Sequence, residues 1–166
     1  MEYLDQYNFD PTKPSFRHGR GHGNSKRQTY AAMVTHMDKK IGDIINLLDS
    51  LDIANNTIVL FMSDNGAELN HGGSSGILRG GKLTEWEGGV RVPFIAKWPK
   101  KIPKGITQDI PVSAIDIFPT IATLLNIPIP ERKIDGKDVS PILLSKNKAK
   151  NPHEAYYFYY KENELQ

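Results

Sequence analysis

The sequence predicts an α/β fold in which helices pack on a mostly parallel β-sheet. Apolar residues recur at steps of three and four over residues 26–51, which is the period of a helix that buries one face. After a turn, residues 57–62 form a continuous apolar run rich in β-branched side chains. Such a run is typical of a strand covered on both faces of a parallel sheet. A helix, a turn and a buried strand in this order are typical of α/β layered folds.

The composition indicates a globular protein and argues against several kinds of partner. Of the 166 residues, 39% are hydrophobic, and the formal net charge is +2, which gives no strong reason to expect nucleic acid as a partner. No apolar run approaches the roughly 18 residues of a bilayer-spanning segment, and no membrane partner is expected. Cysteine is absent, which excludes disulfides, thiolate metal sites and a cysteine nucleophile within these residues.

The first element is expected to be the helix over residues 26–51. Residues 1–29 form an irregular, locally basic lead-in that contains Pro11 and Pro14. Ser25 is followed three residues later by Gln28, and this pair matches a capping box, in which two side chains satisfy free N–H groups at the start of a helix.

The later elements are shorter and are interrupted by proline and glycine. Residues 92–98 are the second strand candidate, 115–125 a short helix with Asp116 as its expected N-cap, and 155–160 a third strand candidate. Residues 67–91 form a long glycine-rich loop, and a loop of that length in a compact domain is usually functional or disordered.

Asp64, Asn65 and Gly66 directly follow the predicted strand at 57–62. In open α/β sheets ligands bind beyond the carboxyl ends of strands, and carboxylate and amide oxygens suit Ca²⁺ or Mg²⁺. The alternative is an ordinary Asx turn that closes the strand. Two ligands do not build a calcium site, which needs about six to eight oxygens, so further ligands are expected from elsewhere.

Lys82 lies between two glycine pairs, Gly80-Gly81 and Gly88-Gly89. Glycines let the backbone approach a ligand closely, and a lysine ammonium is a compact charge suited to sulfate or phosphate. Arg79 and Arg91 could add to this charge or pair with nearby glutamates. The alternative is a mobile surface loop whose charges are solvated.

Taken together, three motifs resemble the arylsulfatase-type sulfatases in order and spacing: Ser63-Asp64-Asn65-Gly66, then residues 78–82 (Leu-Arg-Gly-Gly-Lys), then residues 86–93 (Trp-Glu-Gly-Gly-Val-Arg-Val-Pro). The resemblance extends to the helix at 30–51 and downstream to residues 116–120 and 135–140. It therefore covers residues 30–145, most of the chain.

The resemblance implies a partial alkaline-phosphatase-like α/β/α sandwich and a set of site residues. Asp64 and Asn65 match ligands of the family's divalent cation, usually Ca²⁺, with Mg²⁺ as an alternative. Lys82 matches the lysine that contacts the sulfate group of the substrate, a sulfate ester. His71 lies in the loop between these motifs and is a candidate for the substrate pocket, with a solvated loop histidine as the alternative.

The resemblance also implies a division of the chain: a lead-in over 1–29, the later part of a sulfatase catalytic domain over 30–150, and the start of a small C-terminal subdomain over 151–166. The family's formylglycine nucleophile arises in a Cys/Ser-x-Pro-x-Arg motif, which this sequence lacks. The chain alone is therefore expected to be inactive as a sulfuric ester hydrolase.

The expected partner is the remainder of the sulfatase catalytic domain, and self-association through exposed sheet edges is expected without it. Family members are secreted, periplasmic or lysosomal, and the same is expected here. Two alternatives remain at this point: a phosphomonoester or phosphodiester hydrolase of the same superfamily, and a non-catalytic anion-binding module.

Overall fold

The computed structural model describes residues 7–14, 23–146, 148–157, 159–160 and 164–165. Contacts within the chain divide it into two compact units, Met1–Ile95 and Ala96–Gln166. The first unit carries the candidate metal ligands and Lys82, and the second carries a network of buried polar side chains. Each unit is described separately below.

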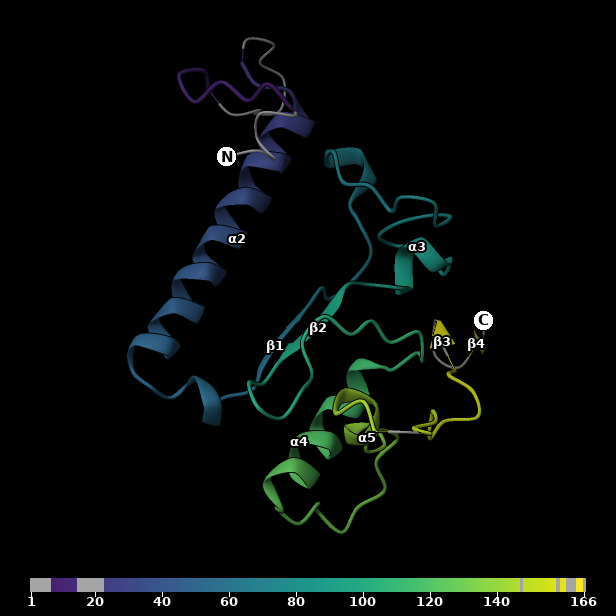
Figure 1. Ribbon diagram of the computed structural model, residues 1–166. Coiled ribbons are helices and arrows are strands. Elements are labelled where there is room, and N and C mark those ends of the chain that lie inside the picture. The colour runs from purple at the N-terminus through teal and green to yellow at the C-terminus, as the bar shows by residue number, and fades with distance from the viewer. Residues whose placement is uncertain (1–6, 15–22, 147, 158, 161–163, 166) are drawn as a thin grey trace. The chain divides into compact units, whose positions relative to one another are not determined.

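The long helix α2 (Lys26–Ser50) opens the first unit (Figure 1). The Ser25 hydroxyl accepts a hydrogen bond from the Gln28 N–H at 3.2 Å, and the Gln28 side chain accepts one from the Ser25 N–H at 2.7 Å. The predicted helix and its capping box are therefore confirmed. Of the helices in the described ranges, none has both the length and the apolar character that crossing a membrane requires.

After α2, the 3₁₀ turn η1 (Ala54–Asn56) leads into strand β1 (Val59–Met62), which pairs with β2 (Phe94–Lys97). Beyond β1, the Ser63 N–H donates to the Pro93 carbonyl at 3.4 Å and the Gly66 N–H to the Gly89 carbonyl at 2.9 Å. The partner residue moves back along the chain as the donor advances, so the two segments run antiparallel there. The parallel pairing that the apolar run at 57–62 predicted is not found between them. All four β1 side chains are half-buried, whereas the apolar run predicted a strand whose side chains are buried on both faces of the sheet.

The glycine-rich segment between β1 and β2 is mostly loop, as expected from its lack of periodicity. It contains the 3₁₀ turn η2 (Leu69–His71) and one short helix, α3 (Glu87–Val90). The loop leaves the end of β1 and returns to the start of β2, so its residues gather at the same end of this strand pair.

The second unit packs two helices around a small core. The 3₁₀ turn η3 (Ala114–Asp116) runs into α4 (Ile117–Leu125), and α4 contacts α5 (Ser140–Leu143). The left-handed conformation of Asn126, with φ of 53°, ends α4. The core between them consists of mainly small or apolar side chains: Thr120, Ala122, Val139, Ser140 and Ile142.

The chain ends in a short antiparallel pair, β3 (Tyr159–Tyr160) and β4 (Glu164–Leu165), with Tyr159 opposite Leu165. The predicted strand over 155–160 is therefore correct only for its last two residues. Residues 155–157 are not in a strand, and Phe158 lies outside the described residues. The aromatic run alone misled the prediction because the Tyr156 side chain is held in a polar network instead of a sheet.

Candidate functional site

Gly66 holds the end of the first candidate motif against the glycine pair that precedes β2. A Cβ atom at Gly66 would lie 2.0 Å from the Gly88 carbonyl oxygen and 2.6 Å from the Gly89 Cα. Both neighbours are backbone atoms, so no side chain could move away to make room. The close approach permits the hydrogen bond from the Gly66 N–H to the Gly89 carbonyl, and only glycine fits this position.

The loop that carries Lys82 is bonded to the same segment. The Lys82 N–H donates to the Ala67 carbonyl at 2.9 Å, directly after Gly66. A Cβ at Gly81 would meet the same carbonyl oxygen at 2.6 Å. Thr84 closes a tight turn, since its hydroxyl donates to the Gly81 carbonyl at 2.8 Å. The structure thus brings the backbone of Lys82 beside the Asp64-Asn65-Gly66 motif.

The side chains of the three principal candidates are available to a ligand. Asp64 and Lys82 are exposed and Asn65 is half-buried. Within the described parts of the chain, no hydrogen bond or ion pair involves any of these three side chains. The Asn65 carbonyl accepts a bond from the Ser63 hydroxyl at 2.8 Å, which orders the backbone and leaves the amide group free.

The other two cations of the loop are already engaged. The Arg79 guanidinium lies 3.5 Å from the centroid of the Trp86 ring, a cation–π contact. Arg91 pairs with Glu87 at 3.6 Å, which is one of the two alternatives that the sequence left open. Among the described residues, Lys82 is the one of these three cations whose side chain has no such partner.

His71 is the last residue of η2, and its Nδ1 lies 3.6 Å from the Glu68 carboxylate. Its side chain is 51% exposed. The start of α2 holds this turn, because the Lys26 ammonium donates to the Asn70 carbonyl at 3.0 Å. The place of His71 in the substrate pocket stays a prediction.

The donor set fits a hard cation, but only as part of a larger site. A carboxylate and an amide oxygen are donors that Ca²⁺ and Mg²⁺ accept. Across the ranges that the structure describes, no group of three or more histidine, aspartate or glutamate side chains could hold a metal ion. Asp64 and Asn65 would therefore act with oxygen ligands from outside these residues.

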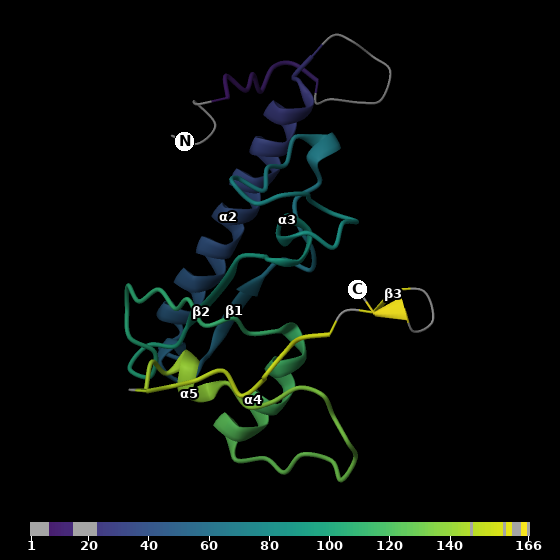
Figure 2. The same cartoon turned by 90° about the vertical axis from the view of Figure 1, so that its right-hand side faces the viewer.

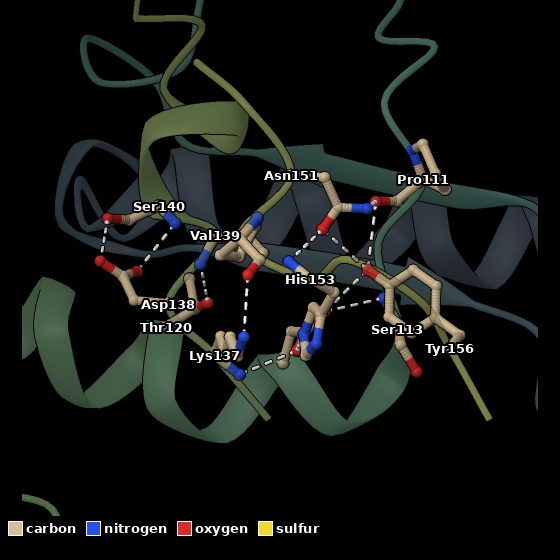
Figure 3. Close-up of polar contacts among 12 residues, drawn as sticks. Pro111, Ser113, Thr120, Lys137, Asp138, Val139, Ser140, Asn151, His153 and Tyr156 are labelled. Carbon is tan, nitrogen blue, oxygen red and sulfur yellow. Dashed lines mark hydrogen bonds and ion pairs between the residues drawn. The ribbon is translucent and has the colours of Figure 1, made fainter. Parts of the chain in front are cut away.

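The second unit contains a polar network that the sequence analysis missed (Figure 3). Its centre is Asp116, which is fully buried. The carboxylate accepts hydrogen bonds from the N–H groups of Ser113 and Lys137, both at 2.9 Å, and lies 2.6 Å from His153 Nε2. The Tyr156 hydroxyl approaches it at 3.5 Å.

The expected role of Asp116 as the side-chain cap of a helix over 115–125 is therefore wrong. Asp116 stands at the N-cap of α4, but its side chain makes no capping bond to α4; it completes a capping box with Ser113 at the start of η3 instead. The carboxylate turns back to the Ser113 N–H and across to Lys137. The sequence offered one signal: an aspartate between apolar residues, Ile115 and Ile117, is a candidate for burial with partners.

The same network explains why the two downstream motifs occur together. A Cβ at Gly136 would lie 1.9 Å from the Ile115 carbonyl oxygen, so glycine is required where the segments touch. The Lys137 N–H bonds to Asp116, and the Val139 N–H donates to the Thr120 hydroxyl at 2.9 Å. Residues 135–140 are thus bonded to residues 116–120 at both of these points.

Comparison with known proteins gives the family. A model of the Sulfatase family matches residues 2–127. Human steryl-sulfatase is 45% identical over 82% of this chain, and human arylsulfatase A is 38% identical over 81%. These stretches amount to 25% and 27% of the two relatives, so the chain spans about a quarter of their length.

Solved structures agree with the sequence comparison. The structure of Ps i-CgsB in complex with k-i-k-neocarrahexaose superposes with a TM-score of 0.74 at 37% identity, over 81% of this chain and 29% of that one. PsFucS1 sulfatase from Pseudoalteromonas sp. gives a TM-score of 0.70 at 30% identity, over 86% and 31%. The predicted fold class is confirmed as a partial α/β fold, and the chain belongs to the sulfatase family.

Proposed function

We propose that the protein to which this chain belongs hydrolyses sulfate esters with the help of a divalent cation. In this proposal Asp64 and Asn65 are two of the cation's ligands, and Lys82 contacts the sulfate group of the substrate. The cation is Ca²⁺, with Mg²⁺ as the alternative. Family membership supports the reaction class, and the arrangement of the glycine-rich loop supports the assignment of the three residues.

One observation carries the proposal. Backbone hydrogen bonds from Gly66 to Gly89 and from Lys82 to Ala67 join the strand-end motif to the lysine loop. A ligand bound at the end of β1 would therefore meet oxygen donors from one segment and an ammonium from the other. This pairing suits a metal-bound anion, because the cation attracts its oxygens from one side and the lysine from another.

The chemistry follows from charge. Sulfuryl transfer builds negative charge on the oxygen that leaves the sulfur, and preorganised positive charge stabilises that transition state. A bound divalent cation would supply Lewis-acid polarisation of the sulfate oxygens. Lys82 would add a second positive charge. Its hydrogen-bonded loop would limit the rearrangement that binding requires.

This chain supplies no covalent nucleophile, because the Cys/Ser-x-Pro-x-Arg motif is absent from its sequence. Residues 1–166 alone are therefore proposed to be inactive, and activity is proposed to require the remaining part of the sulfatase fold. We extend the proposal to the compartment, secreted, periplasmic or lysosomal, on the strength of family membership alone.

The test compares 4-nitrophenyl sulfate hydrolysis by variants of the protein that contains both this chain and the remaining fold. Lys82→Ala should lower kcat/KM by about 10²-fold or more, the usual effect of removing one oxyanion-stabilising group. Lys104→Ala is the matched control, because Lys104 is an exposed lysine of the second unit, and it should change kcat/KM less than about twofold.

Each other outcome contradicts part of the proposal. Equal activity of the Lys82→Ala and Lys104→Ala variants would remove Lys82 from the site. Turnover of 4-nitrophenyl phosphate without turnover of the sulfate would indicate a phosphoesterase of the same superfamily. Binding of sulfate without turnover of either ester would indicate an anion-binding module, and turnover by residues 1–166 alone would disprove their inactivity.

A further inference from the structure

Helix α2 carries two adjacent apolar faces. At about 100° per residue, Val34, Ile41, Ile45 and Leu48 share one face and are half-buried, and Ala31, beside them, is fully buried. This inner face packs on its own chain: α2 contacts η1 near one end and η2 near the other. It accounts for the helical period that the sequence shows.

The second face lies next to the first, along the helix that Figure 2 shows from a second side. At about 100° per residue its members fall within an arc of about 80°, and each is at least 44% exposed. We call them the outer stripe: Met33, Met37, Ile44, Leu47 and Leu51. An open depression lies at its N-terminal end, lined by Thr29, Ala32, Met33, His36 and Met37.

The outer stripe gathers exposed apolar side chains on one side of α2. Exposed apolar patches of this kind mark interaction surfaces, and five large apolar side chains lie on one arc here. Lys40 lies within the same arc, between Met37 and Ile44, and its ammonium bonds to the Asp43 carboxylate at 3.0 Å. The stripe therefore has two apolar parts, Met33 with Met37 and Ile44 with Leu47 and Leu51, on either side of Lys40.

We propose that the outer stripe of α2 is the surface on which the rest of the sulfatase fold docks. The occupant is the part of that fold outside residues 1–166, which would convert α2 from a half-covered helix into one buried on both apolar faces. This inference rests on family membership and on α2, and it is independent of the roles proposed for Asp64, Asn65 and Lys82.

The length of the matched proteins is the argument for this occupant. The match covers 81% of this chain but only 29% of Ps i-CgsB, at a TM-score of 0.74. More than two thirds of that fold is thus additional chain, which has to contact the matched part. A lipid surface fits less well, because α2 exposes Asp38, Asp43 and Asp49 as well as lysines, whereas membrane-surface helices are rich in lysine and arginine on their polar face.

The absence of cysteine allows a direct test by thiol labelling. We would prepare two variants of residues 1–166: Leu47→Cys on the outer stripe, and Asn46→Cys, its exposed neighbour on the polar side of α2. The probe is Ps i-CgsB from which the stretch that matches this chain has been deleted. Labelling by a maleimide is followed from the intact mass of the 166-residue chain, alone and with the probe.

The expected result is a labelling rate at least tenfold lower for the Leu47→Cys variant when the probe is present, with less than a twofold change for the Asn46→Cys variant. A covalent chimera in which residues 1–166 replace the matched stretch of Ps i-CgsB carries the same two substitutions. It keeps the test valid if the deleted protein does not fold, and its Leu47→Cys position should be protected in the same way.

Three results would overturn the proposal. The first is equal labelling of the two cysteines in the chimera. The second is protection of the Leu47→Cys variant that grows with its own concentration when no probe is present, since this would make a second copy the occupant. The third is protection by vesicles of anionic phospholipid but not by the probe or in the chimera.

Discussion

The carboxylate of Asp116 lies 2.6 Å from Nε2 of His153, and the two side chains are only 1% and 7% exposed. This contact joins residues that are 37 positions apart. Lys137 adds two hydrogen bonds between the same segments. Its N–H donates to the Asp116 carboxylate, and its ammonium donates to the Pro152 carbonyl at 2.8 Å. The contact therefore fixes the segment after α5 to the start of α4.

Asp116→Ala should destabilise the second unit by about 3 kcal/mol or more. The substitution leaves the N–H groups of Ser113 and Lys137 and the ring of His153 without their acceptor, and each buried group left unsatisfied costs about 1–3 kcal/mol. The free energy of unfolding in urea measures this. Asp109→Ala, at an exposed aspartate, should stay within about 0.5 kcal/mol of wild type; similar losses in both variants would contradict the role of Asp116.

Tyr156→Phe should change how stability depends on alkaline pH. Burial raises the pKa of the Tyr156 phenol, and the Asp116 carboxylate raises it further, against a hydrogen bond to Asn151 that lowers it. The folded state therefore favours the protonated phenol. Its contribution is complete below the ordinary tyrosine pKa of about 10 and is lost as the pH rises through the higher pKa of the folded state.

The measurement is urea unfolding of wild type and the Tyr156→Phe variant between about pH 8 and 11, a range that spans the ordinary tyrosine pKa. The other titrating groups are common to both proteins, so the difference between the two curves isolates Tyr156. Wild type should lose more stability than the variant above about pH 10. Parallel curves over the whole range would show that the environment of Tyr156 does not favour its protonated form.

Alanine substitutions at two glycines should have opposite effects. Gly66→Ala places a Cβ 2.0 Å from the Gly88 carbonyl oxygen, and a steric conflict of this kind costs about 1–3 kcal/mol. Gly42 lies inside α2, where an added Cβ would have nothing within 4 Å, so Gly42→Ala should stabilise by about 0.5–1 kcal/mol. Thermal unfolding compares the two, and a Gly66→Ala variant as stable as wild type would contradict the close packing of the loop.

Asp64→Asn should weaken calcium binding by the protein that contains this chain and the remaining fold. The change keeps the size of the side chain and removes its charge, and we expect a loss of at least about tenfold in affinity, because even outer-shell partners of a metal site contribute 10–100-fold. Calorimetric titration with Ca²⁺ measures it. Asp49→Asn on α2, at an exposed position, is the control, and an equal affinity of both variants would exclude Asp64 as a ligand.

Local signals in the sequence determined much of this chain. The capping box and the helical period predicted α2 almost to the residue, because a helix depends on side chains three and four positions apart. The apolar run predicted β1. The glycine pairs around Lys82 were expected to let the backbone approach a ligand, and the structure packs them against other backbone segments of the chain. The joint motifs predicted the sulfatase family, which the comparisons confirm.

The tertiary structure alone determined which contacts these residues make. From the sequence, Asp116 resembles a helix cap. In the structure its carboxylate contacts Lys137 and His153, which are distant in the sequence. One apolar period describes α2, but only the fold separates its inner face from its outer stripe. In both cases the reason is the same. Whether a side chain is buried, and which groups it contacts, depends on residues far away in the sequence, and a local sequence pattern does not identify those residues.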